Sequence, residues 1–196
     1  MAPDTENVST TNLTVSDKAG NVVEYTLTIE QTGGSGIVVP GRGFLLNNEL
    51  TDFTTTYDPT DPNRIEPGKR PRSSMSPTIV LKDGKPFLAL GSPGGASIIT
   101  TVLQILVNRL ILKMPLPQAL AAPRASQRNT ATIQAESAFH TQYGPALTAL
   151  GHTFGPDLDP IGAATAMEFT AYGGVIASAE PVRRGGGAAG VVHPAR

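Results

Sequence analysis

The sequence predicts an α+β fold in which antiparallel sheet is covered by helices. Two β-hairpin patterns lie in its first half, a long apolar helix pattern follows the second of them, and two further strand patterns lie near the end. Strands therefore precede the helices and return after them. Strands and helices that are segregated in this way favour antiparallel sheets, whereas a parallel α/β fold would alternate them regularly.

Each hairpin is indicated by strand residues on both sides of a turn. In the first, Leu13 and Val15 alternate with polar residues, residues 17–21 supply turn types, and residues 22–29 are rich in β-branched and aromatic side chains. In the second, residues 77–81 and 87–90 flank an Asp83-Gly84 turn. A short third strand is expected at residues 37–39.

The long helix pattern covers residues 98–111 and is apolar around most of its circumference. This distribution predicts a helix that is buried on nearly all sides. Its polar residues and its length exclude a membrane span, which needs about 20 apolar residues. Elsewhere the sequence predicts short helices at 115–122 and 141–150, strands at 163–169 and 175–179, a proline-rich loop or lid at 54–72, a polar surface segment at 125–132 and an irregular tail from 183.

Composition excludes several classes of function. The 196 residues are enough for one domain and carry a net charge of -1, so the chain lacks the basic character of a nucleic-acid-binding protein. There is no cysteine, which excludes disulfides, thiolate metal sites and cysteine nucleophiles. The three histidines lack the spacing of metal ligands, and no metal or other cofactor is expected.

Three adjacent hydroxyl residues, Ser9, Thr10 and Thr11, stand at the head of the first strand pattern. A hydroxyl is a poor nucleophile at neutral pH unless a base lies beside it. Cutting the chain before such a residue would supply that base as its own new α-amine, and we expect Thr10 to become a nucleophile of this kind. A run of this composition is also common where strands begin, so the run alone leaves both interpretations open.

Other short patterns could complete an acyl-transfer site. Gly94-Gly95 joins a strand to the long helix, where the backbone amides could hold an oxyanion or simply form a tight turn. The Ser73-Ser74 pair could bind a carboxylate, or serve as ordinary strand-entry residues. Glu49 and Asp52 could hold an ammonium group, or belong to a solvated loop.

Four segments, in this order and near this spacing, resemble the small, catalytic subunit of the γ-glutamyltransferase (γ-glutamyltranspeptidase) family. They are Thr-Thr-Asn-Leu-Thr-Val at 10–15, Gly-Phe-Leu-Leu-Asn-Asn-Glu-Leu-Thr-Asp-Phe at 43–53, Lys-Arg-Pro-Arg-Ser-Ser-Met-Ser-Pro-Thr at 69–78, and Gly-Ser-Pro-Gly-Gly at 91–95. The resemblance is strong from Thr10 to about Arg124 and looser after it. Four motifs in a common order are far more specific than any one of them.

The resemblance implies an N-terminal-nucleophile hydrolase fold, a four-layer αββα sandwich of which this chain would be the small-subunit part. It implies a precursor that cuts itself before a threonine, so residues 1–9 would be a pre-cleavage segment and residues 10–196 the small-subunit domain. Matched by position, Thr10 would be the nucleophile and Thr28 the threonine whose hydroxyl bonds it. The other matched residues are Glu30, Glu49 and Asp52 for the substrate α-amino group, Ser73 and Ser74 for its α-carboxylate, and Gly94 and Gly95 for the oxyanion.

This assignment agrees with the chemistry of a γ-glutamyl group, whose far end is a zwitterion that needs carboxylates on one side and hydroxyl donors on the other. The implied partners are a large subunit, glutathione or another γ-glutamyl substrate, and an amino acid, a peptide or water as acceptor. Neither nucleic acid nor a membrane span is expected. The compartment stays open, with the resemblance alone favouring the periplasm or the outside of the cell.

Three departures from the family pattern matter. Asn12 stands where a histidine is frequent, and we expect it only to tune the site. Arg72 replaces a typically apolar residue beside the serine pair, and either adds charge there or faces solvent. Only nine residues precede Thr10, and the large subunit with its substrate-clamping arginine is absent. The chain is therefore expected to be a separately made small subunit, an expressed piece or a fragment.

Three functions remain in competition at this point. The first is γ-glutamyl transfer or hydrolysis together with a large subunit. The second is a related acylase that acts on glutaryl groups of cephalosporins; because a glutaryl group has no α-amino group, Glu30, Glu49 and Asp52 argue against it. The third is a catalytically silent small-subunit fragment that serves only in assembly.

Overall fold

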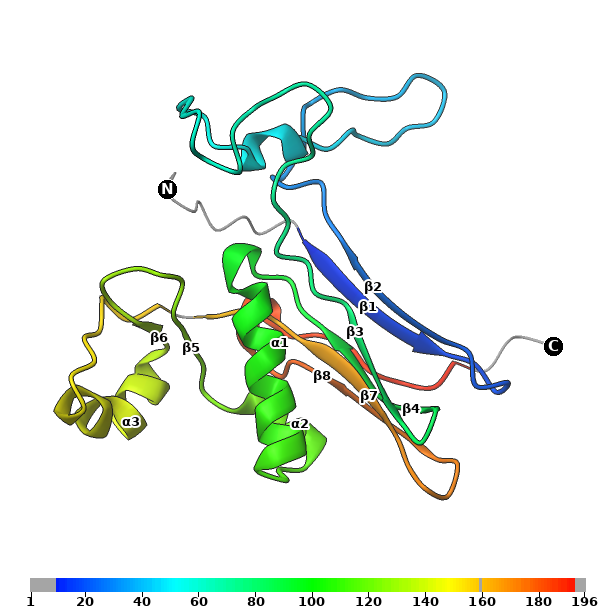
Figure 1. Cartoon of the computed structure of the whole chain (residues 1–196). Helices are drawn as coiled ribbons and strands as arrows, with labels where there is room; N and C mark the ends of the chain where they lie inside the picture. Colours follow the sequence, from blue (N-terminus) through cyan, green and yellow to red (C-terminus); the bar gives the residue numbers. More distant parts are fainter. Residues whose placement is uncertain (1–9, 159, 193–196) are drawn as a thin grey trace.

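The computed structural model describes residues 10–158 and 160–192, which form three layers (Figure 1). The middle layer is a four-stranded antiparallel sheet of β3 (Thr78–Lys82), β4 (Lys85–Gly91), β7 (Thr165–Phe169) and β8 (Val175–Ala179), in the order β3-β4-β7-β8. The helices α1 (Ile98–Leu106) and α2 (Leu116–Ala121) cover one face of it, and the hairpin of β1 (Thr11–Ser16) and β2 (Val22–Leu27) lies against the other. The predicted α+β class is confirmed.

Local sequence accounts for both hairpins. In β1–β2, Asp17 accepts the backbone N–H groups of Ala19 and Asn21 and so closes the turn. In β3–β4, Asp83 and Gly84 both have positive φ, as a two-residue hairpin turn requires. Both predicted hairpins are therefore confirmed. The strand expected at 37–39 is reduced to a single bridge between Val38 and Leu45.

The hydrophobic core lies between the helices and the sheet. Its buried members come from β4, α1, α2 and the start of β7, and are Leu88, Leu90, Ile98, Val102, Ile105, Leu116, Ala119, Leu120, Ala164 and Ala166. The core leaves one side of α1 uncovered. Burial of these apolar side chains holds α1 and α2 against the sheet, because each Å² of apolar surface removed from water contributes about 25 cal/mol of stabilising free energy.

The long helix differs from its prediction in how it is buried. It begins with a 3₁₀ turn at Gly95–Ser97, continues as α1 and ends in one π-helical turn at Val107–Ile111. Ile99, Leu103, Val107 and Ile111 form an exposed row along it, so burial on nearly all sides is wrong for this chain. The helix packs on the sheet with one face, and no described segment covers the other. No helix among the described residues is long and apolar enough to span a membrane.

The remaining elements lie beside the sheet. The strands β5 (Ala125–Ser126) and β6 (Gln134–Ala135) pair with each other, and α3 (Ser137–Ala149) follows them. The prediction of a polar surface segment at 125–132 is wrong at its start, where Ser126 is buried and pairs with Thr100 at 2.7 Å. The tail is also better ordered than expected, because a 3₁₀ turn at Arg183–Gly185 buries Arg183.

Candidate active site

Thr10 and Thr28 lie opposite each other at the end of the β1–β2 hairpin that is farthest from its turn. The register of β1 and β2 pairs Thr11 with Leu27, so the next pair along the hairpin is Thr10 and Thr28. The Thr10 hydroxyl donates to Thr28 Oγ1 at 3.0 Å, and Thr28 Oγ1 also accepts the backbone N–H of Glu30 at 2.8 Å. Thr28 thus fixes the orientation of the Thr10 hydroxyl. Ser9, on the other side of the expected cleavage point, lies outside the described residues.

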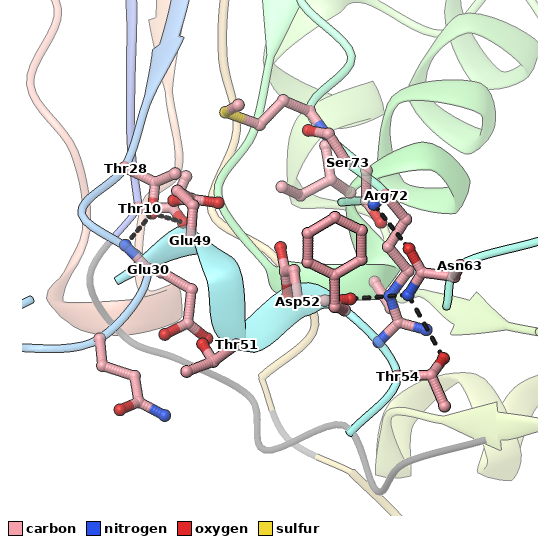
Figure 2. A pocket seen from close by; sticks show the side chains of 17 residues that line it. Thr10, Thr28, Glu30, Glu49, Thr51, Asp52, Thr54, Asn63, Arg72 and Ser73 are labelled. Atoms are coloured by element: carbon pink, nitrogen blue, oxygen red, sulfur yellow. Dashed lines mark hydrogen bonds between the residues drawn. The ribbon is translucent and has the colours of Figure 1, made fainter. Parts of the chain in front are cut away.

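These two threonines line a pocket whose wall comes from four separate parts of the chain (Figure 2). Glu30 follows β2, Glu49 and Asp52 are on the 3₁₀ helix η1 (Glu49–Asp52), Ser73 and Ser74 precede β3, and Gly95 opens the helix after β4. Eight of the nine residues that the sequence singled out line this pocket, and the ninth, Gly94, adjoins Gly95. The structure brings them together, and their roles stay predictions.

The acidic side of the pocket has the electrostatics of a cation site. Burial, together with the nearby charges of Asp52 and Glu30, raises the pKa of Glu49 above its ordinary value. Glu49 Oε1 is buried and accepts no hydrogen bond from the described residues. A buried carboxylate oxygen without a donor is costly, and an ammonium group would relieve that cost.

The opposite side carries the serine pair and Arg72. Arg72 lines the pocket and is exposed, so it adds charge there and also meets solvent. Its backbone N–H donates to Asn63 Oδ1 at 2.9 Å, and the Asn63 amide donates to the carbonyl of Asp52 at 2.7 Å. Asn63, which the sequence analysis did not single out, therefore ties the proline-rich loop to both sides of the pocket. Figure 2 shows Glu30 and Glu49 on one side and Arg72 with Ser73 on the other.

The glycine pair takes backbone conformations that other residues rarely adopt, with φ of 145° at Gly94 and 54° at Gly95. The Gly94 carbonyl is held by the Ser97 hydroxyl at 2.7 Å and the Ser97 N–H at 3.1 Å. Because N–H and C=O point in opposite directions across a trans peptide, this directs the Gly95 N–H away from the helix. A Cβ on Gly94 would lie 3.2 Å from Gly162 Cα, so the chain is packed closely behind the pair.

Within the described residues, no cluster of His, Asp or Glu side chains is arranged to hold a metal ion. The described lining of the pocket offers hydroxyls, carboxylates, backbone amides and the guanidinium group of Arg72. A hydroxyl held beside amides and a cation site is suited to acyl transfer from an amide that carries an amino group.

Comparison with known proteins bears on this arrangement. The family model described as gamma-glutamyltranspeptidase matches residues 1–191. The chain belongs to this family. It is 41% identical over 182 residues to the glutathione hydrolase proenzyme of Bacillus subtilis. This alignment covers 93% of this chain and 31% of that protein. The chain thus spans about a third of that relative's length.

Solved structures of γ-glutamyltranspeptidases have the same fold. A mutant enzyme from Pseudomonas nitroreducens matches with a TM-score of 0.80 and 37% identity, over 94% of this chain and all of that one. A cephalosporin acylase from Bacillus halodurans matches with a TM-score of 0.78 and 30% identity, over 93% of this chain and 34% of that one. The predicted N-terminal-nucleophile hydrolase fold is confirmed, and the described residues contribute to it a four-stranded sheet, the β1–β2 hairpin on one face of that sheet and helices on the other.

Proposed function

We propose that this chain is the catalytic part of an enzyme that hydrolyses or transfers γ-glutamyl groups from glutathione and related amides. The observation that carries the proposal is the Thr10–Thr28 hydroxyl pair, 3.0 Å apart, on the wall of a pocket that also holds Glu30, Glu49 and Asp52. The names of the relatives, glutathione hydrolase proenzymes among them, support it.

The reaction begins with hydrolysis of the Ser9–Thr10 peptide bond, in which water supplies the new carboxylate of Ser9 and Thr10 gains a free α-amine. Thr10 Oγ1 then attacks the γ-carbonyl carbon of the substrate, and the α-amine takes the hydroxyl proton. The amides of Gly94 and Gly95 hold the developing oxyanion. As the tetrahedral intermediate collapses, the leaving amine takes a proton from the ammonium group and a γ-glutamyl ester remains on Thr10. Water or an amino-acid acceptor attacks this ester, releases the glutamyl group and returns Thr10 to its starting state.

The proposed large subunit would cover the outer face of the β1–β2 hairpin. Leu13, Val15, Val23, Tyr25 and Leu27 point away from the four-stranded sheet and are 42–56% exposed. An exposed apolar patch of this kind marks an interface. The relatives' additional length supplies a candidate for what covers it.

A direct test is to produce the chain together with its large subunit and to follow both processing and turnover. Mass spectrometry should find a fragment that begins at Thr10, and the assembled protein should release aniline from a γ-glutamyl anilide. Turnover with an intact Ser9–Thr10 bond would refute the mechanism. Failure of the assembled protein to act on any γ-glutamyl amide would favour a catalytically silent role.

The likeness to a cephalosporin acylase supports a second candidate, deacylation of glutaryl substrates. The two functions differ in whether an α-amino group is recognised. Faster turnover of a glutaryl anilide than of the γ-glutamyl anilide, at matched concentrations, would reverse our order of preference.

Replacing Glu49 with glutamine should raise KM for the γ-glutamyl anilide about tenfold, because a charge-assisted hydrogen bond to the ammonium group is lost. KM for the glutaryl anilide should stay within twofold. Since the pKa of Glu49 is raised, this carboxylate loses its charge above the ordinary value of 4.5 as the pH falls. The wild-type KM should therefore begin to rise above pH 4.5 on acidification, and the Glu49→Gln variant should show a shallower rise. Equal effects on both anilides would contradict an ammonium site.

Replacing Val23 with aspartate should reduce assembly with the large subunit at least tenfold, because it would bury a charge in the interface. Size-exclusion chromatography of the co-produced chains measures the assembled fraction. Lys18→Asp, which introduces the same side chain in the exposed turn of the same hairpin, is the matched control and should assemble normally. Normal assembly of the Val23 variant would show that the large subunit binds elsewhere.

A further inference from the structure

The hairpin that carries Thr10 turns a polar face, not an apolar one, toward the interior. Asn12, Thr14, Glu24 and Thr26 are buried or half-buried on this inner face, whereas the apolar side chains of the hairpin, apart from the half-buried Val22, point outward. Polar groups between two sheets are costly unless every one is hydrogen-bonded. Such a face indicates a role beyond packing.

The centre of this face is a hydrogen-bonded pair, Asn12 and Glu24. The Asn12 amide nitrogen donates to Glu24 Oε1 at 2.7 Å and to Thr26 Oγ1 at 3.1 Å. The other carboxylate oxygen of Glu24 accepts the Thr14 hydroxyl at 2.5 Å. Asn12 Oδ1 accepts the hydroxyl of Thr165, on β7, at 2.6 Å. The pair thus connects the hairpin to the four-stranded sheet.

The Asn12–Glu24 pair lies between two parts of the candidate site, the Thr10–Thr28 end of the hairpin and the glycine pair that follows β4. Asn12 is two residues after Thr10, and Thr26 is two residues before Thr28, on the same face of the hairpin. On the sheet side the pair contacts Gly91, the last residue of β4, where a Cβ would lie 2.3 Å from Asn12 Nδ2 and 2.3 Å from Glu24 Oε1. Gly91 leads through two residues into Gly94-Gly95.

We propose that Glu24 and Asn12 are positioning residues that set Thr10 relative to the glycine pair, an inference that rests on the proposed function. Glu24 fixes which end of the Asn12 amide faces Thr165, because a carboxylate accepts from the nitrogen and cannot pair with the oxygen. With the amide fixed, β1 is held to β7 and against Gly91. A displacement of about 1 Å between a nucleophile and its oxyanion donors costs roughly a hundredfold in rate.

Burial raises the pKa of Glu24 above its ordinary value, against the opposing hydrogen bonds of Thr14 and Asn12. The charged groups of the candidate site, Glu30, Glu49, Asp52 and Arg72, lie on segments outside the two hairpin strands. The pair therefore consists of a neutral amide and one carboxyl group in a half-buried position, where hydrogen bonds are stronger than in water.

The test exchanges donor and acceptor within the pair, in the full protein assembled with its large subunit. Asn12→Asp alone would place two carboxyl groups together, and we expect kcat for the γ-glutamyl anilide at pH 8 to fall at least tenfold with KM within twofold. Adding Glu24→Gln should return kcat to within threefold of wild type, because the introduced amide can donate to the introduced carboxylate and still accept from Thr14. Glu66→Gln, on the exposed proline-rich loop, is the control and should leave kcat unchanged.

Melting temperatures and the rate of processing separate a positioning role of the pair from an effect on general stability. Recovery of kcat in the double variant, with melting temperatures of all variants compared, supports the inference. Because cleavage at Ser9–Thr10 uses the same nucleophile, the rate of processing should fall and recover in parallel. A double variant no more active than Asn12→Asp, in a wild type that turns over the anilide, would overturn this inference alone. An inactive wild type would overturn the proposed function together with it.

Discussion

Replacing Thr10 with alanine is expected to abolish both processing and turnover in the protein assembled with the proposed large subunit. The variant keeps the pocket, its carboxylates and the glycine pair but has no hydroxyl at position 10 for the proposed attack on the γ-carbonyl carbon. Removal of a covalent nucleophile leaves only binding and oxyanion stabilisation, so kcat should fall at least about a thousandfold. Mass spectrometry should find the Ser9–Thr10 bond intact in the same sample.

Thr10→Ser is the matched control, because it keeps the hydroxyl and removes only a methyl group. It should be processed and should retain measurable kcat. Thr28→Ala tests the hydrogen bond that orients this hydroxyl at 3.0 Å, and should lower kcat about tenfold while leaving KM little changed. Turnover by the alanine variant of Thr10 at the wild-type rate would show that another group is the nucleophile.

Local patterns predicted most of the fold because the decisive residues are close in sequence. Asp83-Gly84 has the backbone conformation of a hairpin turn whatever surrounds it, and the alternation around Leu13 defines a strand. The site residues came from contiguous motifs for the same reason. Their convergence on one pocket depends on the packing of distant segments, which no single motif contains.

Burial was harder to predict because it depends on what covers each face. The apolar row of Ile99 and Leu103 has the composition of a buried face, yet the described chain leaves it exposed. The alternation in β1 and β2 identifies two faces but does not say that the polar one points inward. Contacts between distant segments establish that direction, such as the hydrogen bond between Asn12 and Thr165, which are 153 residues apart.

No pattern in the sequence indicated that four charged residues in the second half of the chain would be buried. Arg124, Glu136, Glu180 and Arg183 are each at most 8% exposed and form one network. Arg183 and Glu136 are 47 residues apart, and Arg124 and Glu180 are 56 apart. A glycine-rich context around Arg183 is typical of an irregular tail, so its burial became visible only in the structure.

This network also supports the glycine pair. Glu136 Oε1 accepts the backbone N–H of Ile161 at 2.9 Å, and Arg124 donates to the carbonyl of the same residue at 2.7 Å. Ile161 is followed by Gly162, which packs behind Gly94. Damage to the network should therefore affect the glycine-pair side of the pocket as well as the stability of the fold.

Replacing Arg183 with leucine should lower the free energy of unfolding by about 3–5 kcal/mol, the cost of leaving a buried charge without its partner. Arg183 donates to both oxygens of Glu136, at 2.5 and 2.6 Å, and to Glu180 at 2.8 Å, so the substitution leaves these carboxylates short of donors. Denaturant unfolding of the assembled protein measures the change. Arg42→Leu, on an exposed loop, is the control and should change the free energy of unfolding by less than about 0.5 kcal/mol.

The pH dependence of the free energy of unfolding lost in Arg183→Leu gives a second check. Burial by itself would raise the pKa of Glu136, but the hydrogen bonds from Arg183, Ile161 and Arg124 hold it below its ordinary value. A carboxyl group with a lowered pKa stabilises the fold above its ordinary pKa of 4.5, and this contribution is lost as the pH falls through the lowered value. The difference between wild type and Arg183→Leu should therefore be full at neutral pH and narrow below pH 4.5. A difference that is small at neutral pH, or that grows on acidification, would show that the Arg183–Glu136 pair does not stabilise this end of the fold.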